Sequence, residues 1–199
     1  MKTTGKLHNL NAWERKAATA TSLVVPTEVD GLDELLPCGG WPKNGLVEIV
    51  VPDAYADFMS LLMPALARFS RQGRWIAMVA PPCQARARLF TDSRVDPLRV
   101  LQVNPHPGRS ALWTAESMLQ SGDCGVVMAW PNCNTELMDK RLQNAASSGK
   151  ALAILVRYEG LSMPRSAVDV RLKLEAYADG SAVYLVDSGG EILSGVALP

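Results

Sequence analysis

Residues 45–59, Gly-Leu-Val-Glu-Ile-Val-Val-Pro-Asp-Ala-Tyr-Ala-Asp-Phe-Met, decide the fold of this chain. The apolar run 46–51 predicts a buried β-strand, Pro52 opens a turn, and the following residues begin a helix. A strand that leads through a short loop to a helix N-terminus is an arrangement in which proteins hold phosphate, because backbone amides and the helix dipole favour an anion there. We therefore expect this unit to lie at the centre of the domain.

The residues that would bind a nucleotide in this unit are missing. The phosphate-binding pattern Gly-x-x-x-x-Gly-Lys-Ser/Thr requires two glycines, a lysine and a hydroxyl, and the corresponding positions here hold Val51, Ala56, Asp57 and Phe58. A lysine about 4 Å from a phosphate contributes roughly 4 kcal/mol at an effective dielectric constant of 20, and an aspartate turns that attraction into repulsion. The sequence thus predicts that no nucleotide is hydrolysed here.

The other ingredients of catalysis are missing from the sequence as well. The strand predicted at residues 124–130 ends in Trp130 and Pro131, where an ATPase of this kind would carry a carboxylate that organises Mg²⁺. The chain has two histidines, and its four cysteines form no C-x-x-C pair, which argues against a metal site. We predict a protein that is not an enzyme and that needs no cofactor.

The rest of the chain alternates apolar strands with amphipathic helices. Strands are predicted at residues 74–80, 99–103, 124–130 and 151–156, and helices at 54–70, 84–90, 111–120 and 135–148. This alternation predicts a mostly parallel central sheet with helices on both faces, a three-layer α/β/α fold. Residues 168–177 and 182–186, joined by a turn at Asp179-Gly180, predict an antiparallel strand pair at the C-terminal end.

Composition is consistent with one globular domain. The chain has 199 residues, 48% of them hydrophobic, and a formal net charge of zero. We expect a flexible N-terminal arm at residues 1–27, a core at 28–188 and a C-terminal tail at 189–199. No apolar run approaches the ~20 residues that a membrane-spanning helix needs, so we expect a cytoplasmic protein. Seven arginines and only two aspartates lie between Ala65 and Val100, which makes a DNA-binding accessory domain one of the alternatives.

Residues 31–36 and 39–49, Gly-Leu-Asp-Glu-Leu-Leu and Gly-Gly-Trp-Pro-Lys-Asn-Gly-Leu-Val-Glu-Ile, resemble the entry to the RecA ATPase core. A RecA-like core of this size without a nucleotide site is similar to the ImuA family, accessory factors of SOS-induced mutagenesis, and to SulA, the SOS inhibitor of cell division. The Gly-Gly-Trp-Pro entry, the strand 171–175 and the turn 178–180 favour ImuA. The helix–strand unit 61–75 and the segment 114–118 leading into 125–127 resemble SulA. We prefer the ImuA assignment.

The resemblance implies a non-catalytic adaptor of the SOS response. On the ImuA reading the chain binds an ImuB-type Y-family polymerase homologue, and with it RecA and an error-prone DnaE-type polymerase, and so promotes translesion synthesis. On the SulA reading it binds FtsZ and blocks its polymerisation. Aromatic residues and arginine dominate interface energetics, so the predicted partner-binding residues are Trp41, Trp113, Arg157, Tyr158 and Leu161.

Overall fold

The computed structural model describes residues 24–53, 56–82, 87–106, 110–131, 136–159, 168–177 and 180–198. Most of the predicted N-terminal arm, residues 1–23, lies outside this part of the chain. The last residues of that arm form strand β1 (Val24–Val25), which pairs antiparallel with β2 (Trp41–Pro42). The short helix α2 (Leu32–Leu35) lies between these two strands in the sequence.

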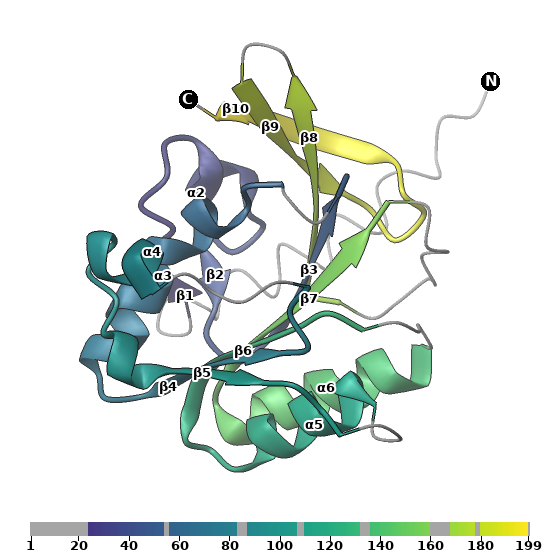
Figure 1. The fold of residues 1–199 in the computed structure, drawn as a ribbon. Coiled ribbons are helices and arrows are strands. Elements are labelled where there is room, and N and C mark those ends of the chain that lie inside the picture. The colour runs from purple at the N-terminus through teal and green to yellow at the C-terminus, as the bar shows by residue number, and fades with distance from the viewer. Residues whose placement is uncertain are drawn as a thin grey trace, which may run out of the picture.

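An eight-stranded sheet forms the centre of the molecule, in the order β10-β9-β8-β3-β7-β6-β4-β5 (Figure 1). The strands from β8 to β5 in this order run parallel, whereas β9 and β10 are antiparallel to their neighbours. Their bounds are β3 (Leu46–Val51), β4 (Trp75–Val79), β5 (Val100–Val103), β6 (Cys124–Ala129), β7 (Leu152–Tyr158), β8 (Val170–Tyr177), β9 (Gly180–Val186) and β10 (Ile192–Leu198). The predicted mixed α/β fold with a mostly parallel sheet is confirmed.

Helices cover both faces of this sheet because successive side chains of the buried strands point to opposite sides. Val47, Ile49 and Val51 of β3 pack on the side of α2, α3 (Met59–Arg71) and α4 (Ala87–Asp92). Leu46 of the same strand packs on the other side, with α5 (Ala111–Gln120) and α6 (Glu136–Gly149). In Figure 1, α5 and α6 lie below the parallel strands and α3 and α4 lie to the left.

The C-terminal end has one strand more than the sequence predicts. β8 and β9 form the expected antiparallel pair, but residues 189–199, expected to be a tail, contain β10, which pairs with β9. The sequence signal is weak because Gly195 interrupts the run, and glycine lowers the propensity for a strand. In the structure this glycine is needed, since a Cβ on it would lie 2.4 Å from the ring of Tyr184 on β9.

Among the helices in the described part of the chain, none is long and apolar enough to cross a bilayer.

Candidate partner-binding surface

A carboxylate lies at the N-terminal end of helix α3. Val51 ends the strand as a buried residue, and α3 begins at Met59. Asp57 lies just before this helix, and its Oδ1 accepts a hydrogen bond from the Ser60 backbone N–H at 3.3 Å. An anionic side chain thus already occupies the positive end of the helix dipole.

Trp41, a predicted partner contact, is fully buried in the structure. It lies in β2, and its side chain packs in the core cluster between the sheet and α3, with no exposed surface. In the sequence Trp41 stands between Gly39-Gly40 and Pro42, and such a stretch has no apolar periodicity from which burial can be predicted. The structure corrects this expectation, because a side chain without accessible surface cannot contact a partner.

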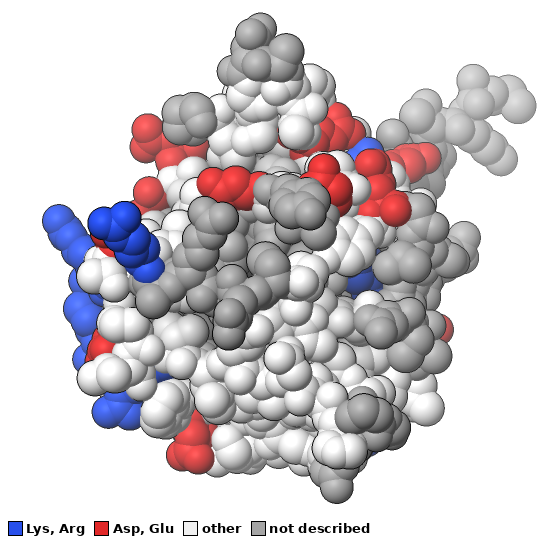
Figure 2. All heavy atoms as spheres, viewed as in Figure 1, with Lys and Arg blue, Asp and Glu red and all other residues white. Residues whose placement is uncertain are grey.

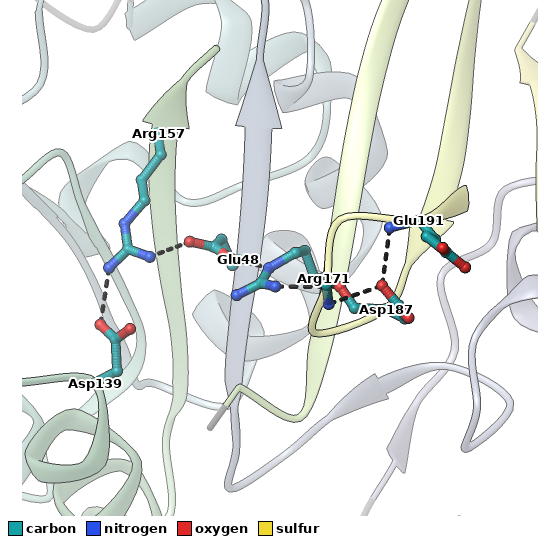
Figure 3. A network of polar contacts seen from close by, with 7 residues as sticks. Glu48, Asp139, Arg157, Arg171, Asp187 and Glu191 are labelled. Carbon is teal, nitrogen blue, oxygen red and sulfur yellow. Dashed lines mark hydrogen bonds and ion pairs between the residues drawn. The ribbon is translucent and has the colours of Figure 1, made fainter. Parts of the chain in front are cut away.

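Arg157, the second predicted contact, lies inside the molecule in a network of charges (Figure 3). Its side chain is 1% exposed, and it bonds Glu48 of β3 through Nη1 and Asp139 of α6 through Nη2, the latter at 2.8 Å. Arg171 of β8 bonds the other carboxylate oxygen of Glu48. The network joins three neighbouring strands to α6, so Arg157 supports the fold and does not contribute to a surface.

The remaining predicted contacts are divided. Tyr158, the last residue of β7, is half-buried and packs against the core cluster on the α3 side. Leu161 lies outside the described residues. Trp113 is 44% exposed on the first turn of α5, where Ser110 caps the helix by accepting a hydrogen bond from the Trp113 backbone N–H at 3.1 Å. Of the five predicted residues, Trp113 is therefore the one that the structure places on an open surface.

Trp113 lies beside a groove of about 420 Å³ between α5 and the edge of the sheet. Trp75 at the start of β4 and Leu101 of β5 contribute further apolar surface to this groove, with exposed fractions of 36% and 41%. The residues that line the groove are Trp75, Leu101, Trp113, Thr114, Ser117, Met118, Ser121, Asp123 and Cys124. We call this set the tryptophan groove.

The tryptophan groove is open because β5 is the last strand on its side of the sheet. Leu101 pairs with Ala77 of β4, which packs under α5. Among the described residues, no strand lies beyond β5 in the sheet, so no further helix is brought over Leu101. This side chain therefore stays in contact with solvent. Leu98, in the 3₁₀ turn η1 (Pro97–Arg99) that precedes β5, is also an exposed apolar side chain, with an exposed fraction of 81%.

A cation lies next to the groove. The Arg99 guanidinium stacks over the Trp75 ring, with 5.3 Å between its carbon and the ring centroid. This cation–π contact orients both side chains, and at a partly exposed site it contributes about 0.5–1 kcal/mol. Sequence reasoning counted Arg99 only as one of many arginines and did not name Trp75. The signal that could have found the pair is a tryptophan at the solvent-facing start of a strand.

The basic region that suggested DNA binding has two parts in the structure. Arg74 is structural, since its guanidinium donates hydrogen bonds to the carbonyl oxygens of Gly122, Cys124, Gly149 and Lys150, at 2.6–3.1 Å. The exposed arginines Arg68, Arg71, Arg88 and Arg94 belong to α3, α4 and the turn after α4. Figure 2 shows blue side chains gathered at the side where α3 and α4 lie, away from most of the acidic residues.

The inner end of the groove holds a thiol with little reactivity. Cys124 is buried at the start of β6, and burial raises the pKa of its thiol to about 11, with a further contribution from the negative charge of Asp123. A thiol with this pKa stays neutral at physiological pH and is a poor nucleophile.

In the described part of the chain, no three His, Cys, Asp or Glu side chains lie close enough together to hold a metal ion. The groove offers apolar contact area, aromatic rings and one cation, the ingredients of a protein–protein contact.

Residues 45–153 match the family model described as "Cell division inhibitor SulA", and this segment is more than half of the 199-residue chain. The chain belongs to the SulA family. The matched segment begins at the turn before β3 and includes every residue of the tryptophan groove.

Individual proteins that are similar to this chain also carry the name SulA. The cell division inhibitor SulA of Edwardsiella piscicida is 27% identical over 117 residues, which cover 58% of this chain and 70% of the relative. SulA of Photorhabdus laumondii is 26% identical over 114 residues, covering 57% and 64%, and SulA of Serratia marcescens is 26% identical over 116 residues, covering 58% and 69%. The crystal structure of SulA from Pseudomonas aeruginosa is 23% identical, with a TM-score of 0.47, and the match covers 57% of this chain and 97% of that one.

These matches correct our preference for ImuA. The predicted adaptor role in translesion synthesis, with an ImuB-type homologue, RecA and a DnaE-type polymerase as partners, is wrong, and the SulA alternative fits the findings better. The misleading residues are the Gly39-Gly40-Trp41-Pro42 entry and the strand around Arg171, which lie outside the matched segment. The ImuA assignment gave these residues too much weight.

Proposed function

We propose that this chain inhibits cell division during the SOS response by binding FtsZ through the tryptophan groove and blocking further assembly of its filament. The observation that carries the proposal is the position of the groove. An exposed apolar surface with two tryptophans lies inside the segment that matches the SulA model, whereas the other tryptophan named by the sequence, Trp41, is buried. The target and the SOS setting come from the resemblance to SulA.

The chemistry of the groove supports a contact with a folded partner. Trp75 and Trp113 present large ring surfaces on rigid elements, a strand and a helix, so little side-chain freedom is lost on binding. Residues of this type carry most of the binding energy in interfaces, typically 2 kcal/mol or more when truncated to alanine. Arg99, held over Trp75, adds a cation that favours a carboxylate on the partner at the rim of the contact.

We infer that inhibition occurs by binding, without catalysis. Support comes from the turn after β3, where Asp57 lies at the N-terminus of α3 and would repel a nucleotide phosphate. Trp130 and Pro131 follow β6, where a carboxylate would be needed to organise Mg²⁺. We also propose that the fold is a RecA-like three-layer core that has kept its parallel sheet as a support for this surface. Inhibition should then require inhibitor concentrations comparable with that of FtsZ.

Polymerisation of purified FtsZ in the presence of GTP tests the proposal. Sedimented polymer should fall as the chain is added, and Trp113→Ala should raise the inhibitor concentration needed for half-maximal effect about tenfold or more, since a loss of 1.4 kcal/mol is tenfold in affinity. The matched control is Leu137→Ala on α6, an apolar side chain that is 68% exposed outside the groove. It should leave inhibition unchanged.

In cells, overexpression of the wild-type chain should produce filaments without septa, and Trp113→Ala should restore division at the same protein level. Two results would count against the proposal. One is FtsZ polymer that is unaffected by an excess of folded chain, and the other is equal inhibition by the wild type, Trp113→Ala and Leu137→Ala.

A further inference from the structure

One face of strands β8, β9 and β10 is open to solvent. On β8, Val170, Leu172 and Leu174 point into the core cluster on the α3 side, so the residues between them point to the opposite face of the sheet. α6 lies on that opposite side, where it contacts β3 and β7. Farther along the sheet, Tyr177 is 54% exposed and Ala197 is also exposed, so the described residues leave this part of the face uncovered.

The cross-strand register shows which residues share the open face. Lys173 of β8 lies opposite Tyr184 of β9, which in turn lies opposite Gly195 of β10. The residues of this surface are Lys173, Glu175, Tyr177, Ala182, Tyr184, Gly195 and Ala197. We call this set the β8–β10 face.

Two tyrosines occupy the centre of the β8–β10 face. The hydroxyl groups of Tyr177 and Tyr184 are 2.9 Å apart, and the Tyr177 hydroxyl also donates a hydrogen bond to Glu175. The Tyr184 ring lies close over Gly195, where a Cβ would be 2.4 Å from it. Aromatic rings next to residues with small side chains allow another segment to approach closely, and such rings contribute strongly to contacts between protein surfaces.

Carboxylates outnumber basic side chains around the β8–β10 face. The Lys173 ammonium group contacts Glu159 at 2.6 Å and Glu175 at 2.8 Å, so two carboxylates balance its charge. Residues 168–198 together carry five carboxylates and two basic side chains, a formal net charge of −3. A segment with basic side chains is therefore attracted to this face.

Residues 1–23 carry the opposite charge. This part of the predicted N-terminal arm lies outside the described residues, and its sequence contains four basic side chains and one carboxylate, a formal net charge of +3. Trp13 is its one aromatic side chain. The segment thus contains the two features that fit the β8–β10 face, namely basic groups for the carboxylates and a ring for the tyrosine pair.

The arm joins the domain beside the start of β8. It leads into Val24 of β1, which pairs with Pro42 of β2. A Cβ on Gly45 would lie 2.9 Å from Pro42 and 2.8 Å from the carboxylate of Asp169, the residue immediately before β8, so these elements are close together. An extended chain spans about 3.3 Å per residue, so 23 residues reach up to about 75 Å, roughly three times the length of β8. The whole β8–β10 face is within this reach.

We propose that residues 1–23 dock on the β8–β10 face of the same chain, with their basic side chains against its carboxylates and Trp13 against the tyrosine pair. The tryptophan groove is also aromatic, but it lies toward the opposite edge of the sheet, and Arg99 beside it repels a basic segment. A tethered segment has an effective concentration on the order of millimolar, so a contact with a dissociation constant of about 100 µM is occupied about nine-tenths of the time. This docking does not depend on FtsZ.

Hydroxyl-radical footprinting of the full chain measures docking through the reactivity of Tyr177 and Tyr184. The variant Lys6→Glu/Arg15→Glu/Lys16→Glu reverses the charge of the arm and replaces attraction by repulsion. The reactivity of the two tyrosines should then rise at least about threefold, since the wild-type face is covered most of the time. For the wild-type chain, a salt concentration of about 1 M, at which the Debye length is about 3 Å, should have the same effect.

Two further variants separate docking from a general effect of charge. The matched control is Arg68→Glu/Arg71→Glu/Arg94→Glu, which makes the same change of charge at exposed positions of α3 and of the turn after α4. It should leave the reactivity of both tyrosines at the wild-type value. Glu159→Lys/Glu191→Lys, at exposed positions beside the face, should restore protection when it is combined with the arm variant, because the two reversals together restore attraction.

Carbodiimide cross-linking of the wild-type chain joins amines to carboxylates in direct contact and so locates the arm. Links from Lys6 and Lys16 to Glu159 and Glu175 should predominate. Links mainly to Asp123 at the tryptophan groove overturn the proposal, and so do links between labelled and unlabelled chains in an isotope mixture. Equal tyrosine reactivity in the wild type and the arm variant also overturns it, as does protection that arises only when FtsZ is added.

Discussion

Replacing Arg157 with methionine should destabilise the fold severely, although the substitution keeps a long flexible side chain. Arg157 and Glu48 have side-chain exposures of 1% and 0%, and Asp139 is equally inaccessible. The wild-type network balances two carboxylates with two guanidinium groups. Without Arg157, both carboxylates stay buried with Arg171 as the one remaining guanidinium of the network.

Removing one partner of a buried ion pair costs about 3–5 kcal/mol, because the remaining charge keeps its desolvation penalty and loses its compensation. Domains of this kind are stable by only about 5–15 kcal/mol. For a chain of this length, each kcal/mol lowers the melting temperature by roughly 2–4 °C, so Arg157→Met should lower it by about 6–20 °C.

Urea unfolding followed by circular dichroism measures this cost, with Arg68→Met as the matched control. Arg68 is exposed on α3, and its replacement should change the free energy of unfolding by less than about 0.5 kcal/mol. The double variant Arg157→Met/Asp139→Leu should be less destabilised than the sum of its two single variants, since it removes a charge pair together. A cost for Arg157→Met no larger than that of Arg68→Met would refute the reasoning.

Three further predictions concern α5, α6 and the groove. Gly149→Ala should lower the free energy of unfolding by more than about 2 kcal/mol, because its Cβ would lie 1.8 Å from the Leu119 carbonyl oxygen. Gly122→Ala should lower it only by the strain of its positive φ, about 1 kcal/mol. Denaturant titration of the two variants compares these costs. Arg74→Met should destabilise the chain by several kcal/mol in the same assay, since it removes four carbonyl contacts. The free energy of unfolding should fall as pH rises from about 9 to about 11, because the Cys124 thiol ionises at a lower pH in the unfolded chain than in the folded one. This fall should be smaller in Cys124→Ala. The same pH dependence of stability in Cys124→Ala and the wild type would contradict the raised pKa of this thiol.

The sequence predicted the centre of the fold because the buried strands have strong signals. The run 124–129 is continuously apolar, and 46–51 is apolar at every position except Glu48; a sheet buried on both faces favours such runs. β10 was missed because its signal depends on a contact with the neighbouring strand: Gly195 is a poor strand residue by itself, and only the packing of Tyr184 over it explains why glycine stands there. The two partners in that contact are eleven positions apart, and no local pattern reports it.

The partner surface was harder to predict for a related reason. Exposure is a property of the assembled layers, and a tryptophan in the sequence gives no sign of whether a layer will cover it. Trp41 is covered by the core cluster on the α3 side, and Trp113 stays open beside the uncovered strand β5. Arg157 shows the same limit for charge, because its partners Glu48 and Asp139 are 109 and 18 residues away.

The affinity of the purified chain for FtsZ tests the central claim most directly. Titration calorimetry should give a dissociation constant on the order of micromolar or tighter for the wild type, and a value at least tenfold weaker for Trp113→Ala. Leu137→Ala should bind as the wild type does. No heat of binding at concentrations well above micromolar, or an affinity that Trp113→Ala leaves unchanged, would contradict the assignment of the tryptophan groove as the FtsZ-binding surface.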